Sequence, residues 1–399
     1  MRSKTIDDIF LNISHFLDHF MMLIFAKAAY DAGKYFGLSY DEIIFYATLG
    51  FIFFGAFAPA ASYLADKYSR SILMVIFHFG IGISAIAAGF SNSIFSLTIA
   101  LAIIGIFAAI YHPVGIAMLL SKNEKTGLRL GINGVFGNMG VAAAPLTVGA
   151  ILLFGDWRMC FFIPGLFCLF YGILFFLSLK DKTKNLAISN LKKDGNFARN
   201  WQWALSSIAL STLGGGFIFG AMTFIVPRYF EVSLLGISNS VAITGALASI
   251  VYACASFAQI AIGKLIDKFS PKTVLTCIAI GQIVFIFLTS LFSDWALFFT
   301  MIVAMLFVFG QIPINDVVLS RYIPDNRRGR ILSMKFMLNL GVGASVLPIC
   351  SFFLQNGYEI RMLFSVMSVI AIFALVAALI LPNQDDKDRM DKLTYKETL

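Results

Sequence analysis

The sequence predicts an all-α membrane protein with twelve transmembrane helices in two pseudo-symmetric six-helix bundles. Three observations lead to this fold class. Hydrophobic residues make up 59% of the 399 residues and charged residues only 13%, whereas a soluble domain carries about 25% charged residues. Apolar stretches long enough to cross a bilayer recur twelve times along the chain. Finally, short motifs of the first half return in the second half at a nearly constant spacing.

Each apolar stretch is predicted to be a helix, because backbone groups in lipid must satisfy their hydrogen bonds internally. The chain starts MRSKTIDD and continues into the first stretch without an A-x-A-like cleavage site, so this stretch is expected to be a span and not a signal peptide. In chain order, the expected spans cover residues 9–30, 42–64, 72–90, 94–120, 129–154, 159–179, 202–227, 240–264, 273–292, 295–320, 331–354 and 361–381.

The positive charges predict the orientation in the membrane. With the N-terminus inside, 24 of the 30 Lys and Arg residues fall in segments on that side. Cytoplasmic segments carry such an excess, so we expect a multi-pass protein of the cell inner membrane with both termini in the cytoplasm. The net charge of +8 is spread over these loops. It is not gathered on one face, as a nucleic-acid-binding protein requires, so no nucleic-acid partner is expected.

The longest polar interruption, residues 180–200, divides the chain into equal numbers of spans. The expected organisation is an N-terminal six-helix bundle (1–179), a cytoplasmic linker (180–200), a C-terminal six-helix bundle (201–381) and a cytoplasmic tail (382–399). SYLADKYSRS (62–71) matches GKLIDKFSPK (263–272), and Arg158 corresponds to Arg361 at a spacing of 203 residues. Such a duplication predicts a substrate site near the midplane, between the two halves.

These repeated motifs resemble the loop signature of the major facilitator superfamily, Gly-x-x-x-Asp-(Arg/Lys)-x-Gly-Arg-(Arg/Lys), and the resemblance extends over essentially the whole chain. It implies a gating loop in each half, which holds the cytoplasmic side shut in one conformation. The charged members of the two loops are Asp66, Lys67, Arg70, Asp267, Lys268 and Lys272. Within the superfamily, SHFLDHF (14–20) and IYHPVG (110–115) resemble the bacterial fosmidomycin-resistance-like transporters.

Ionisable residues inside spans are costly and indicate function. His15, Asp18 and His19 lie on one face of the first span, because their spacings are three and four residues. The resemblance implies that spans one, four, seven and ten line a central cavity. The proton-coupling candidates are Asp18, His15, His19 and Asp316, and the substrate-cavity candidates are Lys27, His112, Asn315, Lys335 and Arg228.

Structural interpretations of the same residues remain open. The cluster in the first span could be a solvated entrance, and Lys335 could extend its amine to the membrane surface. Asp316 could pair with Lys335 and neutralise it. Arg158 and Arg361 each stand beside an acidic residue, which favours a loop ion pair over a substrate contact.

We therefore expect a secondary active, proton-coupled transporter of a small organic solute, anionic or zwitterionic, that works by alternating access. The expected partners are the solute, protons and the lipid bilayer, and the protein is expected to be a monomer. No P-loop motif occurs in the sequence, so ATP hydrolysis by the chain is not expected. The chain is not expected to be an enzyme or to carry a cofactor.

Several alternatives differ in direction or in class. Gly131, Gly140, Pro145 and Gly149 partly match an antiporter pattern of the fifth span, which favours a proton-driven exporter of drugs or toxic metabolites. Cavity cations favour an importer of a polycarboxylate, such as a carboxylate siderophore. A non-transporting sensor would need a longer tail than 382–399. A metal-dependent membrane enzyme would use the intramembrane histidines, but neither a Glu base nor a third ligand stands at a known spacing, so no metal is predicted.

Overall fold

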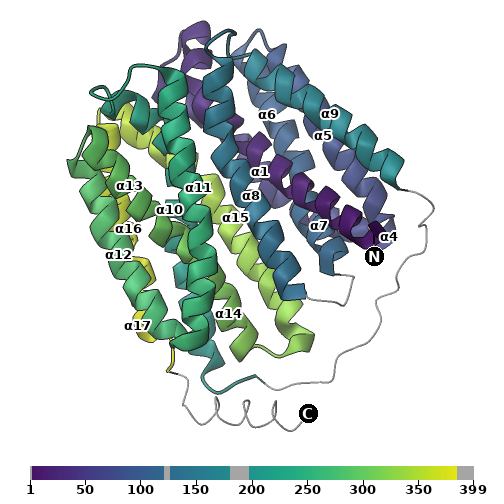
Figure 1. The fold of residues 1–399 in the computed structure, drawn as a ribbon, viewed down its shortest axis with the longest axis vertical. Coiled ribbons are helices and arrows are strands. Elements are labelled where there is room, and N and C mark those ends of the chain that lie inside the picture. The colour runs from purple at the N-terminus through teal and green to yellow at the C-terminus, as the bar shows by residue number, and fades with distance from the viewer. Residues whose placement is uncertain (1, 121–125, 180–196, 384–399) are drawn as a thin grey trace.

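A computed structural model describes residues 2–120, 126–179 and 197–383 of the chain, and in these ranges every regular element is a helix (Figure 1). Twelve helices or interrupted helices are long and apolar enough to cross a membrane, which confirms the predicted number of spans. Large apolar side chains such as Phe154, Phe95 and Phe352 are more than 70% exposed. Such surfaces suit contact with lipid and not with water.

The first half contains six spans, of which the second and the fourth are interrupted. Their helices are α1 (Arg2–Phe36), α2 (Tyr40–Phe45), α3 (Thr48–Ala56), α4 (Ala58–Lys67), α5 (Arg70–Gly89), α6 (Ile94–Ala108), α7 (Tyr111–Leu120), α8 (Thr126–Ile151) and α9 (Met159–Ser178).

The second half has the same number of spans, with the tenth and the twelfth interrupted. Their helices are α10 (Trp201–Ser233), α11 (Val241–Lys268), α12 (Pro271–Leu291), α13 (Asp294–Gly310), α14 (Ile312–Tyr322), α15 (Asp325–Gln355), α16 (Ile360–Ile370) and α17 (Ile372–Ile380). The predicted linker at 180–200 lies outside the described residues except for its last four, and so does most of the predicted tail.

The interruptions in the fourth and tenth spans have the same local cause. Pro113 is the third residue of α7 and Pro313 is the second residue of α14. A proline lacks the amide hydrogen and its ring clashes with the carbonyl four residues before it, so the helix bends or breaks there. At the repeat spacing of 203 residues, Gln311 in the second break corresponds to Ala108 next to the first. Both breaks therefore stand directly before the polar residues of these spans.

The two halves contact each other mainly through α8 with α11, α3 and α2 with α15, and α1 with α10. The contact between α8 and α11 is close at one end: a Cβ added to Gly245 would lie 2.3 Å from the Pro145 oxygen. Small residues allow this approach of two helices. Pro145 and Gly149 of the fifth-span pattern thus pack against the other half.

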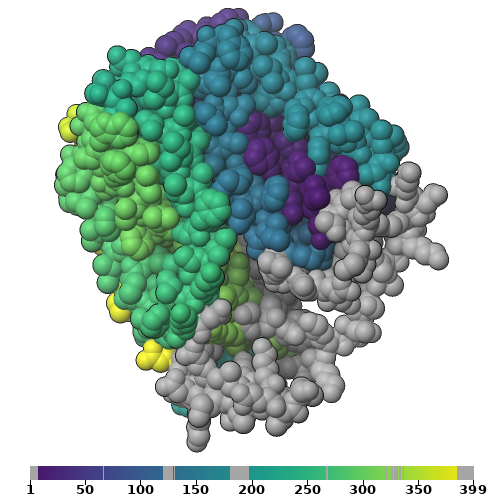
Figure 2. Space-filling view, viewed as in Figure 1, coloured from purple at the N-terminus to yellow at the C-terminus, as the bar shows by residue number. Residues whose placement is uncertain are grey.

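At their other ends, α8 and α11 diverge (Figure 1). A Cβ added to Gly131, Gly134 or Gly263 would meet no neighbouring heavy atom within 4 Å. In the space-filling view, the halves touch over the upper part of the molecule (Figure 2). The protein is thus closed between the halves at one end, and the helices separate towards the end where α1 begins.

Candidate transport site

A buried carboxylate and an imidazole meet where the first span crosses the fourth. His112 Nε2 of α7 lies 3.4 Å from Asp18 Oδ2 of α1. The Asp18 side chain is fully buried, whereas 15% of the His112 side chain is exposed. Within the described structure, no hydrogen bond reaches either oxygen of Asp18. A buried carboxylate with so few partners is costly, which indicates a functional reason for its presence.

Two further imidazoles complete this cluster. His19 Nε2 lies 3.1 Å from His15 Nε2, and both rings contact the His112 ring edge-on, with centroids 5.3 and 5.4 Å apart. His15 Nδ1 lies 2.8 Å from the Asn133 carbonyl oxygen. Because a carbonyl can only accept, this nitrogen of His15 carries a proton. The predicted residues of span one therefore do lie together, and His112 joins them.

The fifth span holds this cluster in place. The Asn133 side chain donates to Tyr111 Oη (2.9 Å) and to Asn12 Oδ1 (2.9 Å). The Tyr111 ring stacks on His15 with a centroid distance of 4.7 Å. A Cβ at Gly137 would lie 2.6 Å from the His15 ring, so this glycine admits the imidazole. Sequence reasoning did not identify Asn133, because an isolated Asn in a Gly-rich span carries no charge or motif.

A second ionic cluster joins the two halves at their closed end. Lys27 Nζ of α1 lies 2.5 Å from Glu231 Oε1 of α10 and donates to Thr244 Oγ1 of α11 at 3.1 Å. Arg228 donates to the other oxygen of Glu231 at 2.7 Å, and its guanidinium lies 3.5 Å from the Tyr30 ring centroid. Two predicted cavity residues, Lys27 and Arg228, are thus bound to Glu231, which the sequence analysis had not identified.

In the second half, uncharged side chains around the break in the tenth span form a hydrogen-bond network. Ser211 Oγ donates to Asn315 Oδ1 at 3.0 Å, and Gln311 donates to Ser211 Oγ at 2.7 Å. Gln282 donates to Gln311 Oε1 at 2.7 Å. Of these residues, only Asn315 was predicted to be a site residue. Placing serine or glutamine in a membrane span costs less free energy than placing a charged residue there, so these residues do not indicate a site in the sequence.

Asp316 forms an ion pair with Lys335 of α15, as one of the structural interpretations anticipated. The Asp316 side chain is 56% exposed and that of Lys335 17% exposed. Lys335 lies within α15 (Asp325–Gln355), the helix of span eleven. This ion pair is more exposed than the cluster around Asp18.

Four of the six charged side chains in the two gating loops lie within the described structure. Lys67 lies 5.5 Å from the Tyr63 ring centroid and Lys272 donates to the Leu379 carbonyl oxygen at 2.8 Å, so both contacts stay within one half. Arg70 is half-buried and Lys268 is exposed. The side chains of Asp66 and Asp267 lie outside the described residues.

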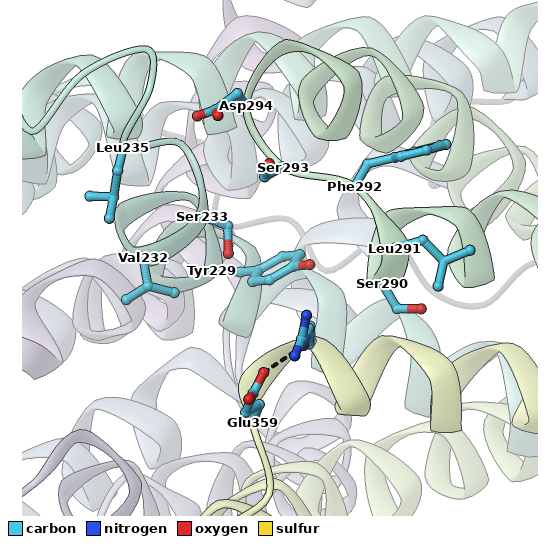
Figure 3. A pocket seen from close by; sticks show the side chains of 11 residues that line it. Tyr229, Val232, Ser233, Leu235, Ser290, Leu291, Phe292, Ser293, Asp294 and Glu359 are labelled. Atoms are coloured by element: carbon cyan, nitrogen blue, oxygen red, sulfur yellow. Dashed lines mark ion pairs between the residues drawn. The ribbon is translucent and has the colours of Figure 1, made fainter.

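The loop ion pairs at the closed end are confirmed. Arg361 Nε lies 2.5 Å from Glu359 Oε2, and Arg158 lies 3.9 Å from Asp156 Oδ2. The Glu359–Arg361 pair borders a pocket of about 480 Å³ (Figure 3). All residues that line this pocket belong to the second half, so it is not a hollow between the halves and does not include the Asp18 cluster.

A family model for the Major Facilitator Superfamily matches residues 10–256 and 235–397. The chain belongs to this superfamily. It is therefore a multi-pass membrane transporter and not an enzyme. The match covers both halves, which confirms the family that the loop signatures indicated.

Curated relatives include the multidrug resistance protein MdtG of Proteus mirabilis (strain HI4320), which is 25% identical over 347 residues, covering 82% of this chain and 83% of the relative. The MdtG protein of Escherichia fergusonii is 22% identical over 346 residues, covering 84% and 83%. These relatives carry the MdtG name and not that of the fosmidomycin-resistance subgroup. They support the superfamily and do not support the subgroup that the sequence resemblance suggested.

Solved structures show the same fold. A crystal structure of a bacterial homologue of the human lysosomal transporter Spinster, in an inward-facing and unoccupied conformation, superimposes with a TM-score of 0.74 at 15% identity, covering 95% of this chain and 96% of that chain. The D-xylose-proton symporter superimposes with a TM-score of 0.72 at 15% identity, covering 94% and 96%. At this identity the likeness establishes the fold alone.

Proposed function

We propose that this protein is a proton-coupled secondary transporter of a small organic solute, anionic or zwitterionic. It acts as a monomer by alternating access in the cell inner membrane, with both termini in the cytoplasm. The observation that carries the proposal is the arrangement of the halves: they are joined at one end, diverge at the other, and contain a buried polar cluster at the crossing of α1 and α7.

Alternating access requires that the closed end opens while the other end closes. Opening would separate Lys27 from Glu231 and Thr244, because these residues belong to different halves. Closure of the opposite end would bring together the two gating loops (Asp66, Lys67, Arg70, Asp267, Lys268 and Lys272). These loops lie on the side of both termini. Their contacts would then join the two halves on that side, as Lys27 and Glu231 join them at the closed end in this structure.

Proton coupling is assigned to Asp18 with His15 and His19, and a secondary role to Asp316. Chains of Asp and His inside transporters form proton relays, and histidine exchanges protons near neutral pH. His112, the direct partner of Asp18, connects the carboxylate to the partly exposed side of the cluster.

The solute is assigned an anionic group because two cations at the interface between the halves, Lys27 and Arg228, are held in place by a carboxylate that opening would withdraw from Lys27. Lys27 and Arg228 share the single carboxylate of Glu231. When the closed end opens, Lys27 would lose Glu231 and could present its ammonium group to an anionic group of the solute. Asn315 and Lys335 would add contacts from the second half.

A second candidate function is the export of drugs or toxic metabolites. The observation that favours it is the name of the relatives, multidrug resistance protein MdtG. The local likeness of residues 14–20 and 110–115 to fosmidomycin-resistance-like transporters points in the same direction.

The experiment that tests these proposals is a solute screen in proteoliposomes with an imposed pH gradient of either sign. We expect a gradient to accelerate the flux of organic anions, including polycarboxylates, more than that of lipophilic cations. Acceleration restricted to lipophilic cations would select the drug exporter, and the gradient sign that drives the flux would give the direction. If the flux of every transported solute were the same with and without the gradient, proton coupling would be wrong.

A further inference from the structure

Three of the four histidines in the chain converge at one point. His15 and His19 come from α1 and His112 from α7, and each offers a ring nitrogen that lies within 4.8 Å of the other two. The fourth histidine, His78, is elsewhere and shares a hydrogen bond with Ser14 Oγ at 3.0 Å. In the sequence, no third metal ligand stands at a known spacing from His15 and His19 of α1. The fold places His112, which lies more than 90 residues further along the chain, beside this pair.

The distances between these groups match those of a metal site. Zinc binds imidazole nitrogens at about 2.0–2.1 Å in tetrahedral geometry, which places two ligand atoms about 3.3 Å apart. His15 Nε2 and His19 Nε2 are 3.1 Å apart, and His112 Nε2 and Asp18 Oδ2 are 3.4 Å apart. The three imidazole nitrogens lie within 4.8 Å of one another, whereas Asp18 lies next to His112 and would have to move towards His15 and His19 to join the same ion.

The surroundings leave the ligand nitrogen of His15 without a proton. His15 Nδ1 donates to the Asn133 carbonyl oxygen, which leaves Nε2 as the nitrogen that faces the cluster. Such a hydrogen bond from the second ring nitrogen is the usual way in which proteins orient a histidine ligand. The Tyr111 ring stacks on His15 and is itself bound by Asn133, so the orientation of the ring is fixed.

Asp18 is the second, independent indication of a ligand. Its carboxylate is fully buried, and neither oxygen has a hydrogen-bond partner in the described structure. Buried polar groups are normally satisfied, and an exception calls for a missing partner such as an ion. A cation between Asp18 and the three imidazoles would satisfy the carboxylate.

We propose that His15, His19 and His112 bind a divalent first-row transition-metal ion, with Asp18 as the fourth ligand. Imidazole ligands suit zinc, copper, nickel and iron, and a tetrahedral set of three nitrogens and one carboxylate oxygen suits Zn²⁺ best. The ion enters past His112 and His19, which are partly exposed. This inference goes beyond the proposed function, because metal affinity is a property of the chain whether or not protons drive transport.

The test is a Zn²⁺ titration of the purified full-length protein in detergent, in competition with a chromophoric zinc indicator and with an affinity tag that contains no histidine. We expect one Zn²⁺ per chain. His19→Ala, His112→Ala and Asp18→Asn should each weaken the affinity by at least about tenfold, since even second-shell changes cost 10–100-fold. His78→Gln is the matched control and should keep the wild-type affinity.

A spectroscopic readout keeps the test independent of folding defects in single variants. Co²⁺ bound to the wild type should give the intense visible absorption of a tetrahedral ion, and this signal should be lost in His112→Ala while size-exclusion elution stays unchanged. The inference is overturned if the wild type binds no more Zn²⁺ than a variant with all three histidines changed to Ala, or if His78→Gln weakens binding as much as His112→Ala. Neither result would bear on gradient-driven flux, so the proposed function stands or falls separately.

Discussion

The fourth and tenth spans contain the same backbone device with different chemistry. In both, a helix is interrupted a few residues before a polar side chain, His112 in one and Asn315 in the other, at nearly corresponding positions of the repeat. In the first half, the break positions His112 against Asp18 and two further histidines. In the second half, it positions Asn315 in a network of hydroxyl and amide groups. The break in the first half therefore positions ionisable side chains, whereas the break in the second half positions Asn315 among neutral hydrogen-bonding groups.

The two networks also differ in how well they are satisfied. The amide donors of Gln311 and Gln282 both have acceptors within 3.1 Å, whereas both oxygens of Asp18 lack hydrogen bonds within the described residues. Gln282 Oε1 also has no hydrogen-bond partner within the described residues, but it belongs to a neutral amide, and a buried carboxylate without hydrogen bonds costs more free energy than a buried amide oxygen. Substitutions in the two halves should therefore have different consequences.

The largest expected effect comes from removing the carboxylate of the first half. Asp18→Asn should lower gradient-driven flux by at least about 100-fold, because a positioned proton-transfer group contributes on the order of 10²–10⁴-fold. Asp316→Asn should lower it far less, since Asp316 is 56% exposed and already paired with Lys335. The measurement is the initial rate in proteoliposomes, with exchange in the absence of a gradient as the control. Equal losses of gradient-driven flux in Asp18→Asn and Asp316→Asn would contradict the proposed difference between the two halves.

The next effect concerns the ionic cluster that joins the halves. Glu231→Gln leaves the buried ammonium of Lys27 without its carboxylate, and breaking a buried pair in this way costs about 3–5 kcal/mol. The double variant Lys27→Met/Glu231→Leu should cost less, because the more deeply buried ammonium of Lys27 is removed together with the carboxylate and only Arg228 loses its partner. Thermal unfolding in detergent measures both.

The reactivity of an introduced cysteine shows whether the loss of stability in Glu231→Gln comes from opening of the closed end. In a cysteine-free background, Phe51→Cys should become more reactive towards a membrane-impermeant reagent when Glu231→Gln is added, since Phe51 packs on Phe224 across the halves. Asp156→Asn, in an exposed loop, is the control. Unchanged reactivity would mean that Glu231 does not hold this end closed.

A smaller effect distinguishes the closed end from the open end. Gly245→Ala places a Cβ 2.3 Å from the Pro145 oxygen, and overpacking of this kind costs about 1–3 kcal/mol. Gly263→Ala on the same helix meets open space and should be neutral or stabilising by about 0.4–1 kcal/mol. Gly245→Ala should therefore lower the melting temperature, whereas Gly263→Ala should leave it unchanged or raise it. A loss of stability in Gly263→Ala as large as in Gly245→Ala would show that the halves also touch there.

The smallest effect is expected in the neutral network of the second half. Ser211→Ala removes the hydroxyl that donates to Asn315, at a cost of about 0.5–1.5 kcal/mol for one hydrogen bond. Stability should fall slightly, while the pH profile of transport stays that of the wild type. A shifted pH profile would assign proton coupling to the second half as well.

The relative positions of site residues within one span could be predicted from the sequence, whereas the contacts between residues of different spans could not. The spacing of His15, Asp18 and His19 was enough to place them on one face, because neighbours on one helix follow from its period. Their contact with His112, the support from Asn133 and the Lys27–Glu231 pair were not predicted. These contacts depend on how two helices are rotated and crossed, and the apolar pattern is nearly the same for many such arrangements.

The sequence by itself determined the solvent, the number of spans and the family. A hydrocarbon environment allows only long apolar helices, and the repeated loop motifs identify a duplicated transporter. The tertiary structure alone decided which charges meet, which end is closed and where three histidines converge. Such contacts depend on distances of a few ångströms between segments far apart in the chain, and only the packed helices determine those distances.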